Sequence, residues 1–134
     1  MKFGKINIVV GAVGLILAAM GGMALGLTFD KQAIKDGYHS LSMVRFYFRD
    51  GHSHGMAFCL YNMFFGLIID RLSFSDKIKK FGSYMAACSL ILPLSLLAKA
   101  FAGAPVDFPP IGILGAIAFV ISICILLSGV KKAV

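Results

Sequence analysis

The side chains best suited to chemistry in this sequence are histidines. His52 and His54 stand two residues apart in the stretch Asp50-Gly-His-Ser-His-Gly-Met56, and His39 precedes them by a short distance. Imidazole is the commonest transition-metal ligand and a frequent axial ligand of haem iron. His52 and His54 are therefore candidate cofactor ligands. The sequence leaves open whether the cofactor is haem, copper or neither.

Helical spacing separates the two histidines. Residues two apart on a regular helix differ by about 200°, so His52 and His54 share one ion only if Gly51–Gly55 is extended. Steps of three or four residues from His52 reach sulfur-bearing side chains, a face that suits Cu(I) or a haem with His/Met ligation. The candidate metal ligands are then His52, Met56, Cys59 and Met63.

The same steps from His54 give an aromatic face, Phe58, Tyr61 and Phe65. Such a face is suited to flanking a porphyrin or to packing on a neighbouring helix. Both faces also have a simpler interpretation, because Met and Cys at helical spacing commonly pack in a core. Histidines near a membrane interface commonly serve as hydrogen-bonding residues, and proton handling is a third alternative.

Four long apolar runs must position these residues. They are Ile6–Thr28, Gly51–Ile69, Gly82–Ala98 and Ile111–Val130, in a chain of 134 residues that is 59% hydrophobic and 14% charged. A bilayer core about 30 Å thick needs roughly 20 apolar residues in a helix, and lipid cannot satisfy a bare backbone. We therefore predict an all-α fold, a single-domain integral membrane four-helix bundle over residues 1–134.

The charges predict the orientation. If the chain crosses the membrane four times, eight Lys and Arg residues lie on one side together with Asp70 and Asp76, which gives that side a net charge of +6. The other side then has a net charge of +1. The positive-inside rule then places both termini in the cytoplasm. The formal charge of +7 is thus explained by topology and attraction to anionic lipid, and nucleic acid is not an expected partner. The first apolar run is longer than that of a cleaved signal peptide, so we expect a retained anchor.

Three further local features are informative. Small residues recur at every fourth position of the first run, a pattern for close helix packing within the chain or with another subunit: Gly14, Ala18, Gly22 and Gly26. The outer segment Lys31–Phe48, ending in alternating aromatics and arginines, is expected to lie at the interface. Pro93 predicts a kink in the third helix. Cys59, Cys88 and Cys124 all fall inside spans, which favours free, packed thiols over disulfides.

Two resemblances follow from these motifs. Gly11 and Gly14, His52-Ser-His54 and Pro110-Ile-Gly112 together resemble the layout of small four-span bacterial membrane proteins. Separately, the ten residues from Arg49 to Phe58 resemble the helix of haem–copper oxidase subunit I relatives that supplies a low-spin haem ligand. That resemblance implies a haem held by one histidine. The chain lacks the further helices and histidines of an oxidase centre.

The expected function is a non-catalytic, accessory subunit of a larger membrane complex in a bacterial or archaeal cytoplasmic membrane. The expected partners are other membrane subunits or further copies of the chain, together with lipid. No Ser/His/Asp spacing, phosphate loop, CxxC or HExxH pattern indicates an enzyme. The alternatives are a small haem- or copper-binding redox protein using His52 or His54, and an oligomeric small transporter or channel.

Overall fold

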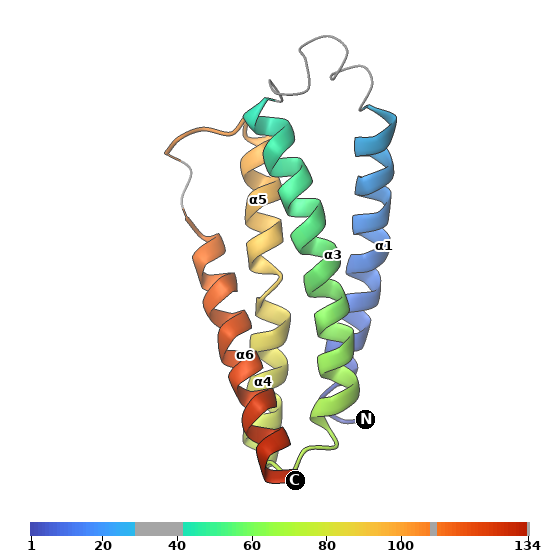
Figure 1. Ribbon diagram of the computed structural model, residues 1–134, viewed down its shortest axis with the longest axis vertical. Coiled ribbons are helices and arrows are strands. Elements are labelled where there is room, and N and C mark those ends of the chain that lie inside the picture. Colours follow the sequence, from blue (N-terminus) through green and yellow to red (C-terminus); the bar gives the residue numbers. More distant parts are fainter. Residues whose placement is uncertain (29–41, 108–109, 134) are drawn as a thin grey trace.

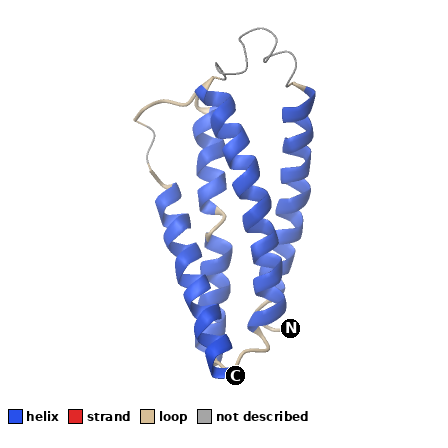
Figure 2. Ribbon diagram, in the orientation of Figure 1, coloured by secondary structure: helices blue, strands red, loops and turns tan. Residues whose placement is uncertain are grey.

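The computed structural model describes residues 1–28, 42–107 and 110–133. Within these ranges the chain is helical and contains no strand (Figure 2). The helices are α1 (Lys5–Leu27), α3 (Met43–Ile69), α4 (Asp76–Cys88), α5 (Ile91–Phe101) and α6 (Gly112–Ala133). The predicted all-α class is therefore confirmed for the described part of the chain.

Three of the helical segments are long and apolar enough to cross a membrane: Lys5–Leu27, Asp76–Phe101 and Gly112–Val130. These correspond to the first, third and fourth predicted spans. α3 has 27 residues, enough for about 40 Å at 1.5 Å per residue. It does not meet the same apolar criterion, because its first half carries Arg45, Arg49, Asp50 and the two histidines.

α3 begins at Met43, eight residues earlier than the predicted start at Gly51. Residues 43–48 of the predicted interfacial segment are helical and continuous with α3, and residues 31–41 lie outside the described ranges. Ser42 is the N-cap of α3, and its hydroxyl accepts a hydrogen bond from the Arg45 N–H at 3.4 Å. No Gly or Pro interrupts residues 43–50. The arginines and aromatics therefore extend the helix.

The third predicted span is divided into α4 and α5 by a break at Ser89–Leu90. Proline removes one hydrogen bond and clashes with the carbonyl four residues before it, and four residues before Pro93 is Ser89. The Ser89 carbonyl accepts instead from the Leu92 N–H at 3.1 Å. The expected kink is thus present as a break one turn ahead of the proline.

Figure 1 shows the helices as an up-and-down arrangement. α3 lies beside α1 and contacts both α4 and α5, whereas α6 packs on α4 and α5. Both marked chain ends lie at the same end of the molecule as the α3–α4 turn. The C-terminal end of α1, the start of α3 and the end of α5 lie at the opposite end. We call these the terminal end and the far end.

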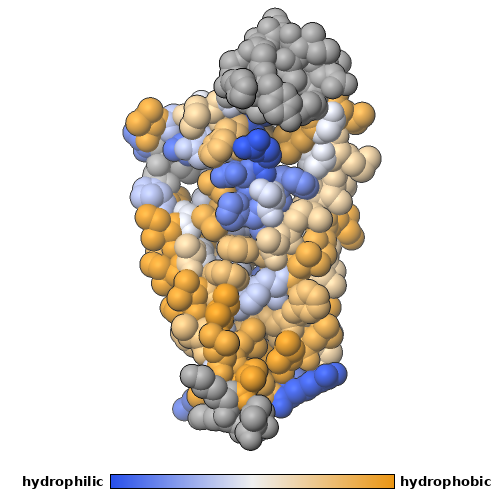
Figure 3. Space-filling model, in the orientation of Figure 1, coloured by the Kyte–Doolittle hydropathy of each residue, from blue (hydrophilic) through white to orange (hydrophobic). Residues whose placement is uncertain are grey.

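Apolar side chains lie mainly on the surface of this protein, whereas in a water-soluble protein they lie mainly in the core. The buried apolar core is small, with Phe65, Ile69, Leu72 and Ala86 at its centre. Large apolar side chains cover most of the visible face, and hydrophilic ones gather near the top centre and along the lower edge (Figure 3). A molecule with this surface requires lipid around it. The membrane class inferred from the sequence is supported by the same three spans.

Candidate functional site

His52 joins α3 to α1. Its Nδ1 lies 2.9 Å from the carbonyl oxygen of Ala18. Because a carbonyl only accepts, Nδ1 carries the hydrogen, and a neutral ring then presents a lone pair on Nε2. The ring lies across Gly22, where an added Cβ would stand 2.5 Å from Cε1 and 2.9 Å from Nε2. Only a glycine leaves room for the imidazole at this place.

His54 lies on the opposite side of α3, as the helical spacing predicts. Its Nδ1 donates to the carbonyl of Asp50 one turn earlier, at 2.9 Å. Its ring meets Phe58 edge-on with centroids 6.1 Å apart, and Phe58 stacks on Phe119 of α6 at 4.5 Å. Tyr61 adds a hydrogen bond to Ser122 of α6 at 2.6 Å. The predicted aromatic face is therefore a packing surface for α6, and the two histidines do not converge on one ion.

Two of the predicted sulfur-bearing ligands, Cys59 and Met63, lie along the contact with α1. The Cys59 side chain fills the space beside Gly14, and the Met63 side chain lies 2.7 Å from where a Cβ on Gly11 would stand. Seven residues separate His52 from Cys59, about 10 Å along a helix, so they do not reach one ion. In the described ranges no group of three or more His, Cys, Asp or Glu side chains is placed to hold a metal.

The small residues that recur along α1 do not all pack against α3. Gly14 and Gly22 lie against Cys59 and His52 of α3, and the Cβ of Ala18 would lie 3.9 Å from one added to Gly55. Gly26 differs, because a Cβ there would meet no described atom within 4 Å. Three of these small residues thus pack within the chain, and the fourth is open.

A lateral groove adjoins His52. Its volume is about 490 Å³, and it runs between α1 and α5 over the exposed side of α3. Its floor includes Gly51 and Gly55, and its walls include Leu17 of α1 and Leu94 of α5. Among its lining residues the imidazole of His52 is the one strongly polar side chain. We call this space the His52 groove.

A buried amide pair holds α1, α3 and α4 together near the terminal end. Asn7 and Asn62 are fully buried, and the Asn7 amide donates to Asn62 Oδ1 at 3.0 Å and to the Ser83 carbonyl at 2.8 Å. The Asn62 amide donates to the Ala86 carbonyl at 2.8 Å. Polar pairs of this kind join helices inside a bilayer. The sequence signal was an asparagine within each of two apolar runs, and its significance was missed.

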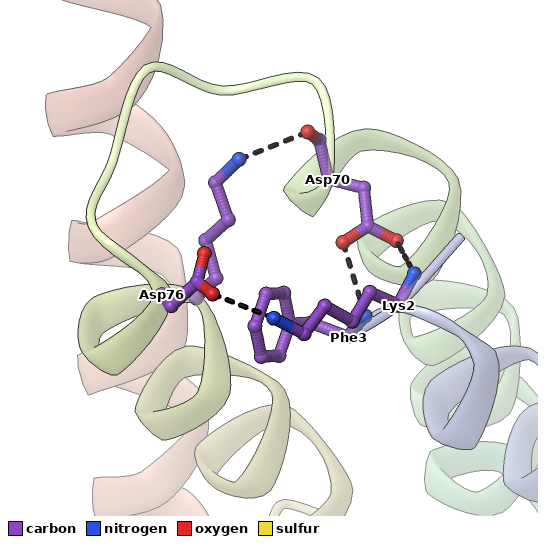
Figure 4. A network of polar contacts seen from close by, with 5 residues as sticks. Lys2, Phe3, Asp70 and Asp76 are labelled. Atoms are coloured by element: carbon purple, nitrogen blue, oxygen red, sulfur yellow. Dashed lines mark hydrogen bonds and ion pairs between the residues drawn. The ribbon is translucent and has the colours of Figure 1, made fainter.

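Asp70 binds the free backbone N–H groups at the start of α1 (Figure 4). Its carboxylate accepts from the backbone N–H groups of Lys2, Phe3 and Gly4 at 2.9, 3.0 and 3.2 Å. Partial burial raises the pKa of Asp70, but these hydrogen bonds outweigh that effect and hold the pKa below its ordinary value. A negative charge at a helix start also complements the helix dipole. In the sequence Asp70 stands beside Arg71 at the end of a span, which is typical of a surface pair or a helix-end charge, and its backbone partners were not predicted.

The surrounding contacts reinforce this junction. Lys2 pairs with Asp76 at 2.7 Å, and the Lys79 ammonium donates to the Asp70 carbonyl at 3.0 Å (Figure 4). Both Lys2 and Asp76 are largely exposed, so their ion pair contributes little by itself. The structural role lies with the Asp70 carboxylate.

Arg45 performs the complementary task at the other end of α1. Its guanidinium donates to the Leu25 carbonyl at 2.8 Å and to the Thr28 hydroxyl at 3.1 Å. A cation at a helix end is favourable for the same dipole. Nearby, the Lys99 ammonium lies 4.7 Å from the centre of the Tyr47 ring, a cation–π contact. Arg45 and Lys99 at the far end thus have structural partners.

These contacts leave the His52 groove as the strongest candidate site in the described part of the chain. The interior polar groups otherwise serve packing. Comparison with protein-family models, with characterised proteins and with solved structures gives no match to this chain.

Proposed function

We propose that this chain is a non-catalytic integral subunit of a membrane complex, held to its partner through α1. The partner is a transmembrane helix of another subunit or of a second copy. The membrane is the cytoplasmic membrane of a bacterium or archaeon. The chain crosses it four times, with α3 as the second span and both termini in the cytoplasm.

The observation that carries the proposal is the low burial of α1. Only 6% of its most apolar window is buried inside the chain, against 28% for Asp76–Phe101 and 22% for α6. Its outward side chains Ile16, Met20 and Met23 are each more than 60% exposed. Helices in lipid associate through close packing; α1 packs on α3 along one face, and its outward face obtains no such packing from the described residues.

The open glycines of α1 support the same conclusion. An added Cβ at Gly21 or Gly26 would meet no described atom within 4 Å. Glycine in a helix costs about 0.5–1 kcal/mol relative to alanine, and nothing within the described chain offsets that cost at these positions. Small residues at the surface of a membrane helix permit another helix to approach closely.

Photocrosslinking in the native membrane tests this proposal. We expect benzoylphenylalanine at Met20 of α1 to give a discrete product of higher mass, because a partner helix covers this position. The matched control is Leu127 of α6, which is 59% exposed against 61% for Met20, and it should give no discrete protein product. Twice the 14.3 kDa chain mass identifies a second copy, and another mass identifies a different subunit.

The proposal is contradicted if neither position yields a protein product and the purified chain behaves as a uniform monomer. Equal products from Met20 and Leu127 would also count against α1 as the contact.

The orientation is supported by charge and by the polar groups of α3. The terminal end carries the basic excess, including Lys2, Lys5 and Lys80, and positive residues remain on the cytoplasmic side. The polar first half of α3 is compatible with a span, because Arg45 bonds the end of α1 and both histidines bond backbone carbonyls. Such satisfied groups are tolerated at membrane depth.

Cysteine labelling tests the orientation. In a variant lacking Cys59, Cys88 and Cys124, we expect Val106→Cys to react with a membrane-impermeant maleimide in intact cells. Val106 is 99% exposed, at the far end. Lys77→Cys, beside the α3–α4 turn, should react only after the membrane is permeabilised. The reverse pattern would show that the termini lie outside.

A further inference from the structure

His52 is the one strongly polar residue among the described residues that line the His52 groove, and none of those residues is charged. His52 Nδ1 donates to the Ala18 carbonyl, which leaves Nε2 as the acceptor of a neutral ring. The described residues give Nε2 no hydrogen-bond partner. An acceptor without a partner in an apolar environment is unfavourable. A ligand that carries a hydroxyl donor would satisfy it.

The size of the groove indicates a slender ligand. Its volume of about 490 Å³ is roughly three times that of a 150 Å³ apolar cavity that holds benzene, so it accommodates on the order of twenty carbon atoms. The lining of α1 extends from Val9 to Leu25, about 24 Å along the helix axis. A transmembrane helix about 10–12 Å wide would fill several times this volume over that length. An extended hydrocarbon tail fits inside the groove, whereas a helix could only pack across its opening.

The charge of the lining excludes an ionic headgroup. No Lys, Arg, Asp or Glu is among the lining residues. A phosphate would therefore meet no cation in the groove, and an ammonium no carboxylate. Burying either charge without a partner is costly. A headgroup that lies in the groove beside His52 is therefore neutral.

We propose that the His52 groove binds a neutral, long-tailed lipid whose headgroup donates a hydroxyl to Nε2 of His52. The occupant we propose is an isoprenoid hydroquinone, which has one tail, because the two acyl chains of a diacylglycerol exceed the volume of the groove. The lipid site does not require the partner proposed for α1: Gly21 borders both surfaces, but Met20, the crosslinking position, does not line the groove, so the two proposals can fail separately. It assigns His52 as a ligand-binding residue and leaves His54, which lies toward α6, without this role.

Nitrogen NMR provides the direct test. The protein, labelled with ¹⁵N-histidine in nanodiscs, is titrated under argon with an isoprenoid hydroquinone and separately with dioleoylglycerol. We expect the Nε2 resonance of His52, and not that of His54, to shift on binding. A shift with the hydroquinone and none with dioleoylglycerol would support the proposal, whereas a shift with dioleoylglycerol alone would overturn the assignment to a single-tailed lipid.

A chemical comparison isolates the hydroxyl. The dimethyl ether of the hydroquinone retains the tail and ring but has no donor. We expect it to bind the wild-type protein about tenfold more weakly, the value of one hydrogen bond in an apolar site. In His52→Leu the two compounds should bind equally, whereas His54→Leu should preserve the tenfold difference.

A second pair of variants tests the site without changing His52, in case the His52 variant does not fold. Gly21 lines the groove and Gly26 does not, and an added Cβ meets no described atom at either position. We expect Gly21→Leu to abolish binding and Gly26→Leu to leave it unchanged. Equal binding of ether and hydroxyl compounds by the wild type, or no shift with either lipid, would overturn the proposal. A Soret band on protein from the native membrane, lost in His52→Leu, would assign Nε2 to haem instead.

Discussion

Replacing Asn62 by leucine is expected to destabilise the contact of α1 with the rest of the chain by about 2–4 kcal/mol. Asn62 accepts from Asn7 and donates to the Ala86 carbonyl. Hydrogen bonds between membrane helices contribute about 0.6 kcal/mol each on average and up to about 1.7. The variant also leaves part of a fully buried Asn7 amide without a partner, which adds a desolvation cost.

The thiol of Cys59 is a built-in reporter of this change. It is 2% exposed and lies against Gly14 of α1, so a maleimide reaches it when α1 separates from α3. With Cys88 and Cys124 replaced by serine, Asn62→Leu should raise the labelling rate at least about thirtyfold. Leu60→Ala, at a 44% exposed position of the same helix, should change it less than about twofold. Similar rates for both variants would show that the amide pair does not hold the helices.

Adding a single methyl group at Gly66 is expected to have the second large effect. An added Cβ would stand 2.5 Å from the carbonyl oxygen of Gly4 and 2.8 Å from Cγ1 of Ile8. The Gly4 carbonyl accepts from Ile8 N–H in the first turn of α1, so the backbone is not free to move away. Overpacking costs about 1–3 kcal/mol, and we expect Gly66→Ala to reach the upper part of that range.

The same Cys59 assay measures this effect. Gly66→Ala should raise the labelling rate about 30- to 100-fold, the equivalent of about 2–3 kcal/mol. Gly21→Ala is the matched control, because its methyl group would meet no described atom within 4 Å, and its rate should stay within about twofold of the parent. If the two methyl groups had the same effect, close backbone contact between α1 and α3 would not explain their packing.

The sequence was sufficient for features that depend on local pattern. The apolar runs of α1 and α6, the break before Pro93 and the divergence of His52 from His54 follow from residue type and helical period. α3 was placed eight residues short because its first turns carry charges, which an apolar criterion excludes.

The missed features depend on which helices are neighbours and at what relative height. Asp70 was visible as a carboxylate at the end of a span, but its backbone partners lie 66 to 68 residues away. Arg45 and Asn62 have partners on another helix in the same way. The His52 groove likewise exists only because α1 and α5 both border α3 without closing over it. Such features are set by tertiary register, which a single sequence pattern does not encode.

Arg45 and Asp70 lie at opposite ends of α3 and bind the two ends of α1. The length of α3 between them therefore has to match the length of α1. From Arg45 to Asp70 the axis of α3 extends about 37 Å, and from Gly4 to Thr28 that of α1 extends about 36 Å. The two antiparallel helices are therefore equal in span to within one residue. Sliding α1 by one turn, about 5.4 Å, would detach the carboxylate and the guanidinium from their backbone partners together. The relative height of α1 and α3 is thus fixed at both ends, because the matched lengths let the Asp70 and Arg45 contacts form at the same time.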